Sequence, residues 1–374
     1  MGWWFWKLSR RDAVHVAALF PPQERDWSLP AQVPLTPLAA EKVAREAAQH
    51  SFAEVARGLV LDWHLEEEGL DGKQIQRWSE RLGEALVIKR TAEIKGLACG
   101  IKPQGPLNAP VLMVMGMDGG RVQMNQKDEK TGSCWREDKV ASFTSYLPGD
   151  GKDRPPRKLV TTYTATMENA QAFGEMVALE AYRRGLWQAP VVLNISDAGN
   201  WIDPLAELQH LADVRIIDFY HAAERLFEAA QAVLGKDTSQ AYLQGEQLEE
   251  LLYQGKVVQV IQWMQEQARQ LGPPQEADGP THPRQVLRQN LGYFEKHQAH
   301  MKYDFYRSQG WPIGSGNVEA GVKGFNKRVK GTDQFWSYKG VEAILALRAQ
   351  WMSQDQRWER YWNNRTAYGF AQAA

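Results

Sequence analysis

The chain has 374 residues, of which 43% are hydrophobic and 24% charged, as in a globular protein large enough for more than one core. Its formal net charge of −1 excludes a surface that is basic throughout, so any binding of nucleic acid must use local basic patches. The two cysteines, Cys99 and Cys134, lack the CxxC or CxxH spacing of a zinc site and are too few for a disulfide framework. No run approaches the ~20 apolar residues of a membrane span, so we expect a cytoplasmic protein with no membrane partner.

Residues 1–37 form a segment rich in Trp and Pro. Its apolar run is too short for a signal peptide, and the positive charges follow that run instead of preceding it. We therefore expect this segment to be disordered or a truncated start, and to lie outside the folded domains.

Residues 38–105 have the pattern of a small helical domain. Ser51 is the expected N-cap of one helix, and Asp71 or Gly72 begins a second helix over KQIQRWSERLGEAL. Two helices joined by a short turn with glycines are typical of a helix-turn-helix, and equally of an ordinary helical hairpin. Lys73 and Arg77 on the second helix suit contacts with DNA phosphates, or plain exposure to solvent.

Strand patterns dominate residues 106–218. VLMVMGMD ends at Asp118, and the following Gly119-Gly120 predicts the turn of a hairpin. Three strands, a helix, a strand, a helix and a further strand form the order of a ribonuclease H-like α/β domain with a mixed sheet. The later elements are expected at Trp135–Tyr146, Lys158–Thr166, Asn169–Gly185 (helix), Val191–Asp197, Trp201–Leu211 (helix) and Val214–Asp218.

Residues 219–310 have apolar residues at helical spacing throughout and predict an all-helical insertion in this catalytic domain. The loop GPPQEADGPTHP divides the block. After that loop we expect one long amphipathic helix. Its apolar stripe is Leu287, Leu291, Phe294, Met301 and Phe305. Residues 311–374 then complete the catalytic core with helices.

Three acidic residues, far apart in sequence, suggest a metal site. Asp118 and Asp197 each end a strand pattern, and Glu319 follows a Gly-Ser-Gly turn on the first turn of a helix. Mg²⁺ prefers carboxylate oxygens, and two such ions ~3.5–4 Å apart can activate an attacking oxygen and stabilise the leaving one at phosphorus. In this hypothesis Asp118 bridges both ions, Asp197 holds one and Glu319 the other.

Each of these residues also has a simpler interpretation. Asp118 before two glycines and Asp197 before Ala-Gly-Asn suit turns or caps, and Glu319 suits the positive end of a helix dipole. Asp218 is expected to cap a helix or to lie beside the site, with His221 assisting proton movement there.

A basic run follows Glu319 and is the expected contact with DNA. As with any charge run, the alternative is a solvated helix face. Its members are Lys323, Lys327, Arg328, Lys330 and Lys339.

Over about Leu38 to Trp362 the chain resembles DDE transposases of the ISKra group of bacterial insertion sequences. The motifs that carry the resemblance are MDGGRV, SDAGNWI, DFYHAAERL, PIGSGNVEAGVK and KRVKGTDQFWSYKGVEAILALRAQWMS. The resemblance implies a catalytic triad of Asp118, Asp197 and Glu319 with two Mg²⁺ or Mn²⁺ ions. It also implies strand cleavage and transfer on double-stranded DNA, at element ends and target, by a homo-oligomer in the bacterial cytoplasm and nucleoid, with no small-molecule substrate.

The chain departs from this family in two places. Ala198 follows Asp197 where the family has Gly, and no Cys-containing segment precedes the helical region. A decayed or repurposed DNA-binding protein is therefore the main alternative, although all three acids are retained. A glycoside hydrolase with paired carboxylates is a third hypothesis, suggested by the 15 Trp residues, most of which have core spacing.

Overall fold

The computed structural model describes residues 29–371 except 31, 66–69, 130, 153, 199–201, 203–210 and 332–333. Most of the N-terminal segment 1–37 and most of the helix expected at Trp201–Leu211 therefore lie outside the described residues. The helices before the sheet are α3 (Pro37–Ala47), α4 (Phe52–Asp62) and α5 (Gly72–Ala98). The described residues include no helix with the length and apolar character needed to cross a membrane.

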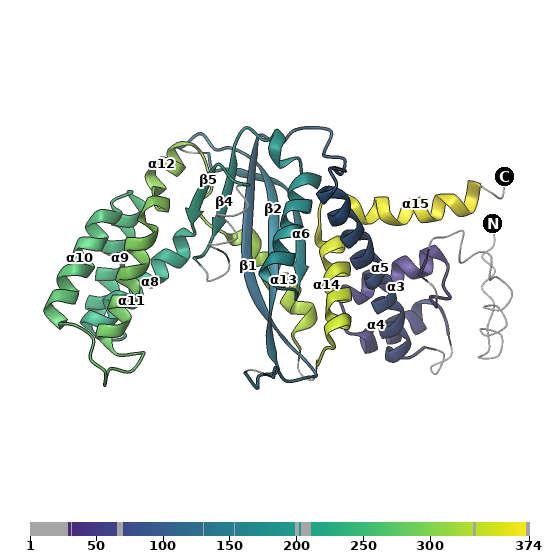
Figure 1. The fold of residues 1–374 in the computed structure, drawn as a ribbon, viewed down its shortest axis with the longest axis horizontal. Helices are drawn as coiled ribbons and strands as arrows, with labels where there is room; N and C mark the ends of the chain where they lie inside the picture. The colour runs from purple at the N-terminus through teal and green to yellow at the C-terminus, as the bar shows by residue number, and fades with distance from the viewer. Residues whose placement is uncertain are drawn as a thin grey trace.

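The centre of the molecule is a five-stranded sheet in the order β3-β2-β1-β4-β5 (Figure 1). Its strands are β1 (Leu112–Gln123), β2 (Trp135–Leu147), β3 (Arg157–Thr166), β4 (Val192–Ser196) and β5 (Val214–Ile217). β1 pairs antiparallel with β2, and β2 antiparallel with β3. β4 is parallel to β1, and β5 is parallel to β4. This order and these directions are those of a ribonuclease H-like mixed sheet, so the expected fold class is confirmed.

The hairpin expected at Gly119-Gly120 is wrong. β1 continues through both glycines, which pair with Lys139 and Asp138 of β2. The glycines serve close packing instead of a turn, because a Cβ on Gly120 would lie 2.5 Å from the Asp138 carboxylate. Asp118 therefore lies within an antiparallel ladder and not at the end of a strand.

Helices cover both faces of the sheet. On one face, α6 (Ala170–Arg183) packs Phe173 against Met113, Met115 and Phe143. Phe143 and Phe173 are fully buried, and each such side chain contributes about 1.5–3 kcal/mol to stability. Asn169 caps α6 and Gly185 follows it in the left-handed conformation, as expected.

The opposite face is covered by α13 (Gly316–Val329) and α14 (Tyr338–Met352), which share a core with β1–β3 and the N-terminal helices. Gly83 of α5 lets α5 and α14 meet backbone to backbone, since a Cβ there would lie 2.2 Å from the Ala343 carbonyl oxygen. Both N-caps predicted upstream, Ser51 and Asp71, are confirmed, each in a capping box. α5 is 27 residues long and packs along α14.

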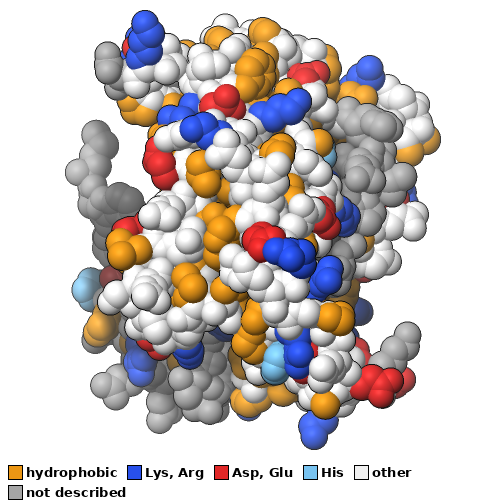
Figure 2. All heavy atoms as spheres, turned by 90° about the vertical axis from the view of Figure 1, so that its left-hand side faces the viewer, with side chains coloured by type: hydrophobic (Ala, Val, Ile, Leu, Met, Phe, Trp, Pro, Cys, Tyr) orange, Lys and Arg blue, Asp and Glu red, His pale blue; other side chains and the backbone are white. Residues whose placement is uncertain are grey.

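The chain leaves the sheet after β5 for a helical unit at the left of Figure 1, whose apolar core is continuous with side chains of β1, β2, β4 and β5. On the face of this unit that Figure 2 shows, basic, acidic and apolar side chains are interspersed. Its helices are α8 (Phe219–Leu234), α9 (Ser239–Tyr253), α10 (Val257–Leu271), α11 (Pro283–His297), η2 (Gln298–His300) and α12 (Tyr303–Ser308).

The long amphipathic helix expected in this unit is wrong. α11 ends at His297, η2 follows, and α12 begins at Tyr303. The break turns the chain so that the Tyr303 hydroxyl donates to the Ile217 carbonyl oxygen of β5 at 3.0 Å. Phe305, assigned to the apolar stripe, is instead 48% exposed.

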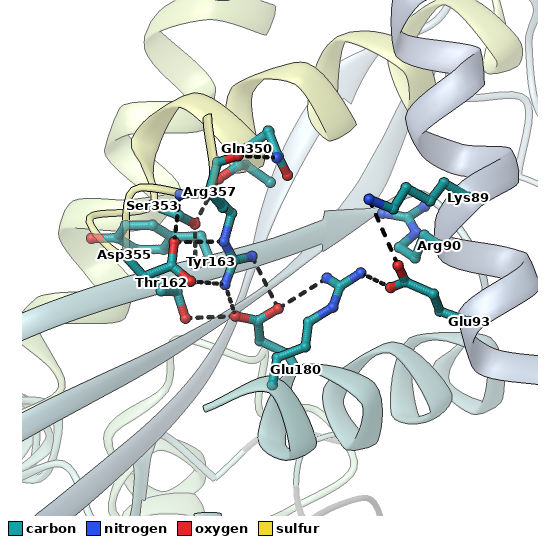
Figure 3. A network of polar contacts seen from close by, with 12 residues as sticks. Lys89, Arg90, Glu93, Thr162, Tyr163, Glu180, Gln350, Ser353, Asp355 and Arg357 are labelled. Carbon is teal, nitrogen blue, oxygen red and sulfur yellow. Dashed lines mark hydrogen bonds and ion pairs between the residues drawn. The ribbon is translucent and has the colours of Figure 1, made fainter. Parts of the chain in front are cut away.

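A buried ion-pair network joins α6 to α15 (Arg357–Ala371), the last helix (Figure 3). Glu180, 1% exposed, accepts hydrogen bonds from Arg357 at 2.5 Å and Thr162 at 2.6 Å, and pairs with Arg183 at 3.3 Å. Burial alone would raise the pKa of Glu180, but the charge and hydrogen bond of Arg357, the charge of Arg183 and the hydrogen bond from Thr162 lower it to about 2. The network therefore holds a charged carboxylate in the interior.

We expect Arg357→Met to lower the free energy of unfolding by about 3–5 kcal/mol, because it leaves Glu180 as a buried charge without its main partner. Since the folded pKa of Glu180 lies below its ordinary value of 4.5, its stabilising contribution is complete above pH 4.5 and declines towards pH 2. Urea unfolding from pH 7 to pH 3 measures both effects. Arg360→Met is the control, because its 61% exposed side chain pairs only at the surface; equal losses for the two variants would contradict the prediction.

Candidate metal centre

The strand register brings three carboxylates to one level of the sheet. Met115 pairs with Asn194, and Asp118 and Asp197 each lie three residues further along their strands. Ser196 pairs with Ile217, and Asp197 and Asp218 each follow by one residue. Because neighbouring parallel strands keep this spacing, the carboxyl end of β4 places Asp197 beside Asp118, and the carboxyl end of β5 places Asp218 beside Asp197.

Glu319 reaches this level from α13, where it lies in the first turn as the sequence predicts. α13 approaches β1 closely because Gly116 has no side chain: a Cβ there would lie 3.0 Å from Val318. The Ser315 hydroxyl donates to Glu319 Oε1 at 3.3 Å. Lys323, one turn later, pairs with Glu319 Oε2 at 3.6 Å.

Asp218 organises the surrounding backbone. Its fully buried carboxylate accepts hydrogen bonds from the N–H of His221, at 2.9 Å, and from the N–H of Ser315. It is thus the N-cap of α8, as predicted, and it also fixes the loop that leads into α13. His221 Nε2 lies 3.8 Å from Glu319 Oε1. Asp218, His221 and Glu319 each offer a ligand atom, all within 4.8 Å of one another.

Asp118 and Asp197 lie beside that trio but are not part of its tightest grouping among the described residues. The Oδ1 atom of each accepts a hydrogen bond from the next backbone N–H at 2.7 Å. Tyr293 of α11 donates its hydroxyl to Asp197 Oδ1 at 3.2 Å. We name these five residues the acid cluster: Asp118, Asp197, Asp218, His221 and Glu319.

The electrostatics of the acid cluster favour a cation. Burial raises the pKa of Asp118, and the charges of Glu319 and Asp197 raise it further, against the Gly119 N–H and His221. Burial would lower the pKa of His221, but the carboxylates of Asp218, Asp197, Glu224 and Glu319 raise it. Half-buried like charges at one level repel each other unless positive charge neutralises them. Carboxylate oxygens with one imidazole are a donor set that fits a divalent cation.

Two residues near the acid cluster were not anticipated from the sequence. Tyr293 belongs to the apolar face of α11, so its spacing gives no sign of a polar role. Asp138 of β2 pairs with Gly120 of β1. Burial raises the pKa of Asp138 to about 6, although its own backbone N–H and the charge of Lys330 lower it. Asp138 lies among the charged residues Arg136, Glu137 and Lys139, so the sequence gives no sign that it is buried.

The predicted contact of Arg328 with DNA is wrong. Arg328 is 2% exposed, donates to the Ala47 carbonyl oxygen at 2.6 Å and lies over the rings of Phe52 and Trp336. Burial lowers its pKa to about 10. It therefore fastens α13 to the N-terminal helices and does not reach solvent. The other residues of that contact are exposed: Lys323, Lys327, Lys330, Lys339, Lys73 and Arg77.

Comparison with known proteins gives little further information. No protein-family model matches the chain, and no curated protein sequence matches it. Among solved structures, the chain is similar to one titled "Drosophila P element transposase strand transfer complex", with a TM-score of 0.37 and 10% identity over 93% of this chain and 99% of that chain. A likeness of this size establishes no relationship by itself, so the function has to be argued from the acid cluster.

Proposed function

We propose that the protein is a DDE transposase, which cleaves and transfers DNA strands by metal-dependent phosphoryl transfer. The observation that carries the proposal is the common level of Asp118 and Asp197 on neighbouring parallel strands, with Glu319 brought to them by α13. The motifs shared with ISKra-group transposases support the finer assignment to bacterial insertion sequences. That assignment adds two element ends, target DNA, a homo-oligomer and the bacterial nucleoid as the setting.

Asp118, Asp197 and Glu319 would hold two divalent ions, Mg²⁺ or Mn²⁺. Bound there, the ions supply Lewis acidity towards a phosphodiester and lower the pKa of a coordinated water or 3′-hydroxyl. The chain's own part is positional: the sheet sets the spacing of the two aspartates, and Asp218 fixes the entry to α13 through the Ser315 N–H. Tyr293 orients Asp197 by its hydrogen bond, and Ser315 orients Glu319.

Asp118→Asn is expected to abolish metal-dependent cleavage of DNA that carries the sequences flanking this coding region. The rate should fall at least ~100-fold, since changing groups that only orient metal ligands already costs about 10–100-fold. Gel analysis of end-labelled DNA in Mg²⁺ or Mn²⁺ measures the rate. Asp304→Asn, at an exposed acid on α12, is the matched control and should cleave normally. Cleavage that persists in Asp118→Asn would refute the proposed site, and DNA binding with no cleavage by the unaltered chain would favour a decayed transposase.

Divalent cations should raise the melting temperature, and Asp118→Asn should remove most of that gain. Saturation at 100 times the dissociation constant stabilises a protein by about 2.7 kcal/mol. Without metal the same variant should be at least as stable as the parent, because the raised pKa of Asp118 means that its charge is unfavourable in the folded state. Thermal unfolding in EDTA and in Mg²⁺ or Mn²⁺ tests both statements. An equal metal response in parent and variant would contradict the assignment.

The exposed part of the basic run is expected to contact DNA phosphates. Replacing Lys327 and Lys330 with Ala should reduce the slope of log affinity against log salt by about 2, one for each lost phosphate contact. Lys323 is left unchanged because it pairs with Glu319. Fluorescence anisotropy with labelled duplex between 50 and about 200 mM salt measures the slope. An unaltered slope would mean that this helix face is merely solvated.

A further inference from the structure

A groove of about 990 Å³ lies along β3. We name it the α5–α15 groove. It is bounded by α5, the end of α6, the start of α15 and the segment 103–111, with β3 as its floor. The polar network of Figure 3 lies along it. Neither the proposed reaction nor the basic run after Glu319 makes use of this groove.

The lining of the groove is strongly basic although the chain as a whole is not. Six cationic side chains face it against two carboxylates, those of Glu93 and Asp355, whereas the complete sequence has a net charge of −1. Five of the six are arginines, whose planar guanidinium matches phosphate with two parallel hydrogen bonds. The cations are Lys89, Arg90, Arg183, Arg184, Arg357 and Arg360.

Arg184 shows that this charge is not fully used inside the protein. Its side chain is 7% exposed, and within the described part of the chain its Nε has no hydrogen-bond partner. Burial lowers its pKa, and the nearby charges of Asp355 and Glu180 offset this effect only in part. A buried guanidinium nitrogen without an acceptor costs free energy. Because Arg184 lines the groove, an anionic ligand there would attract its charge.

A polar contact links the edge of the groove to the start of α13. Leu159 lines it, and the preceding residue, Lys158, donates to Asn317 Oδ1 at 3.3 Å. Asn317 lies two residues before Glu319 on α13. This contact places Lys158 between the groove and the helix that carries Glu319. The exposed apolar side chains of Leu107 and Leu159 at the groove suit the sugars between the phosphates.

We propose that the α5–α15 groove binds the phosphate backbone of the DNA that flanks the phosphodiester at the acid cluster. The inference rests on the proposed function for the choice of DNA as ligand. Arg357 and Arg183 are held by Glu180 and form the fixed wall of the groove. Lys89 and Arg360, whose side chains are 58% and 61% exposed, are held by exposed contacts, with Glu93 and with Asp355, and can exchange these for phosphates.

The test uses Lys89→Gln with Arg360→Gln in the full chain, made in the Asp118→Asn background so that no DNA is cut. Binding to a labelled duplex is followed by anisotropy in EDTA at several salt concentrations. The slope of log affinity against log salt should fall by about 2, and the affinity at 0.1 M salt by about tenfold. Arg184→Gln should also weaken binding, with a slope reduced by about 1.

The matched control is Lys256→Gln with Arg269→Gln, which removes two exposed cations from the helical unit. It should bind DNA as the parent does. Equal slopes for the groove variant, the control and the parent would overturn the inference. So would displacement of the DNA by polyglutamate at the same charge concentration, since the groove would then favour acidic protein.

The test of the groove is independent of the test of the acid cluster. Metal-dependent cleavage that needs Asp118, together with an unaltered groove variant, would leave the proposed function standing and remove the groove. Loss of DNA affinity in the groove variant, with no cleavage by the parent, would support DNA binding in the groove and contradict the proposed function. Thermal unfolding of each variant confirms that it is folded before binding is compared.

Discussion

The buried carboxylate of Asp218 accepts hydrogen bonds from the N–H groups of His221 and Ser315, and so links the end of β5 to the starts of α8 and α13. The position of Glu319 depends on this link, because Ser315 begins the helix that carries it. Asp197 occupies the equivalent position after β4, and Asp118 lies level with it on β1. The constraint is therefore geometric. Backbone pairing fixes the positions of Asp118 and Asp197, and the buried Asp218 fixes the start of the helix that carries Glu319.

Holding these charges together requires the rest of the fold to be rigid. The sheet is packed between α6 and the pair α13 and α14, and glycines at positions 116 and 83 allow helices to approach without intervening side chains. The ion pairs of Glu180 tie α15 to α6 on the other side of β3. A chain with a net charge of −1 would have no affinity for phosphates if its charges were evenly distributed. In this chain, acidic side chains gather in the acid cluster and basic ones along the α5–α15 groove.

The sequence was sufficient for features that depend on neighbours in the chain. Ser51 and Asp71 cap helices by accepting a hydrogen bond from a backbone N–H three residues away, so their patterns are local. Predictions of features that depend on residues distant in the sequence were wrong, or the features were missed. Gly119-Gly120 has the composition of a turn, but the carboxylate of Asp138 across the ladder occupies the space of a side chain. Arg328 has the spacing of a surface base, and only Ala47 and the aromatic rings around it show that it is buried.

The helical unit between β5 and α13 begins and ends at one point: the Phe219 N–H donates to the Ile313 carbonyl oxygen at 3.0 Å. A segment of this kind can lengthen or shorten during evolution without displacing the strands that flank it. Tyr293 and Tyr303 nevertheless reach back from it to Asp197 and to the Ile217 carbonyl oxygen. A movement of this unit would therefore shift the side chains that contact Asp197 and the end of β5.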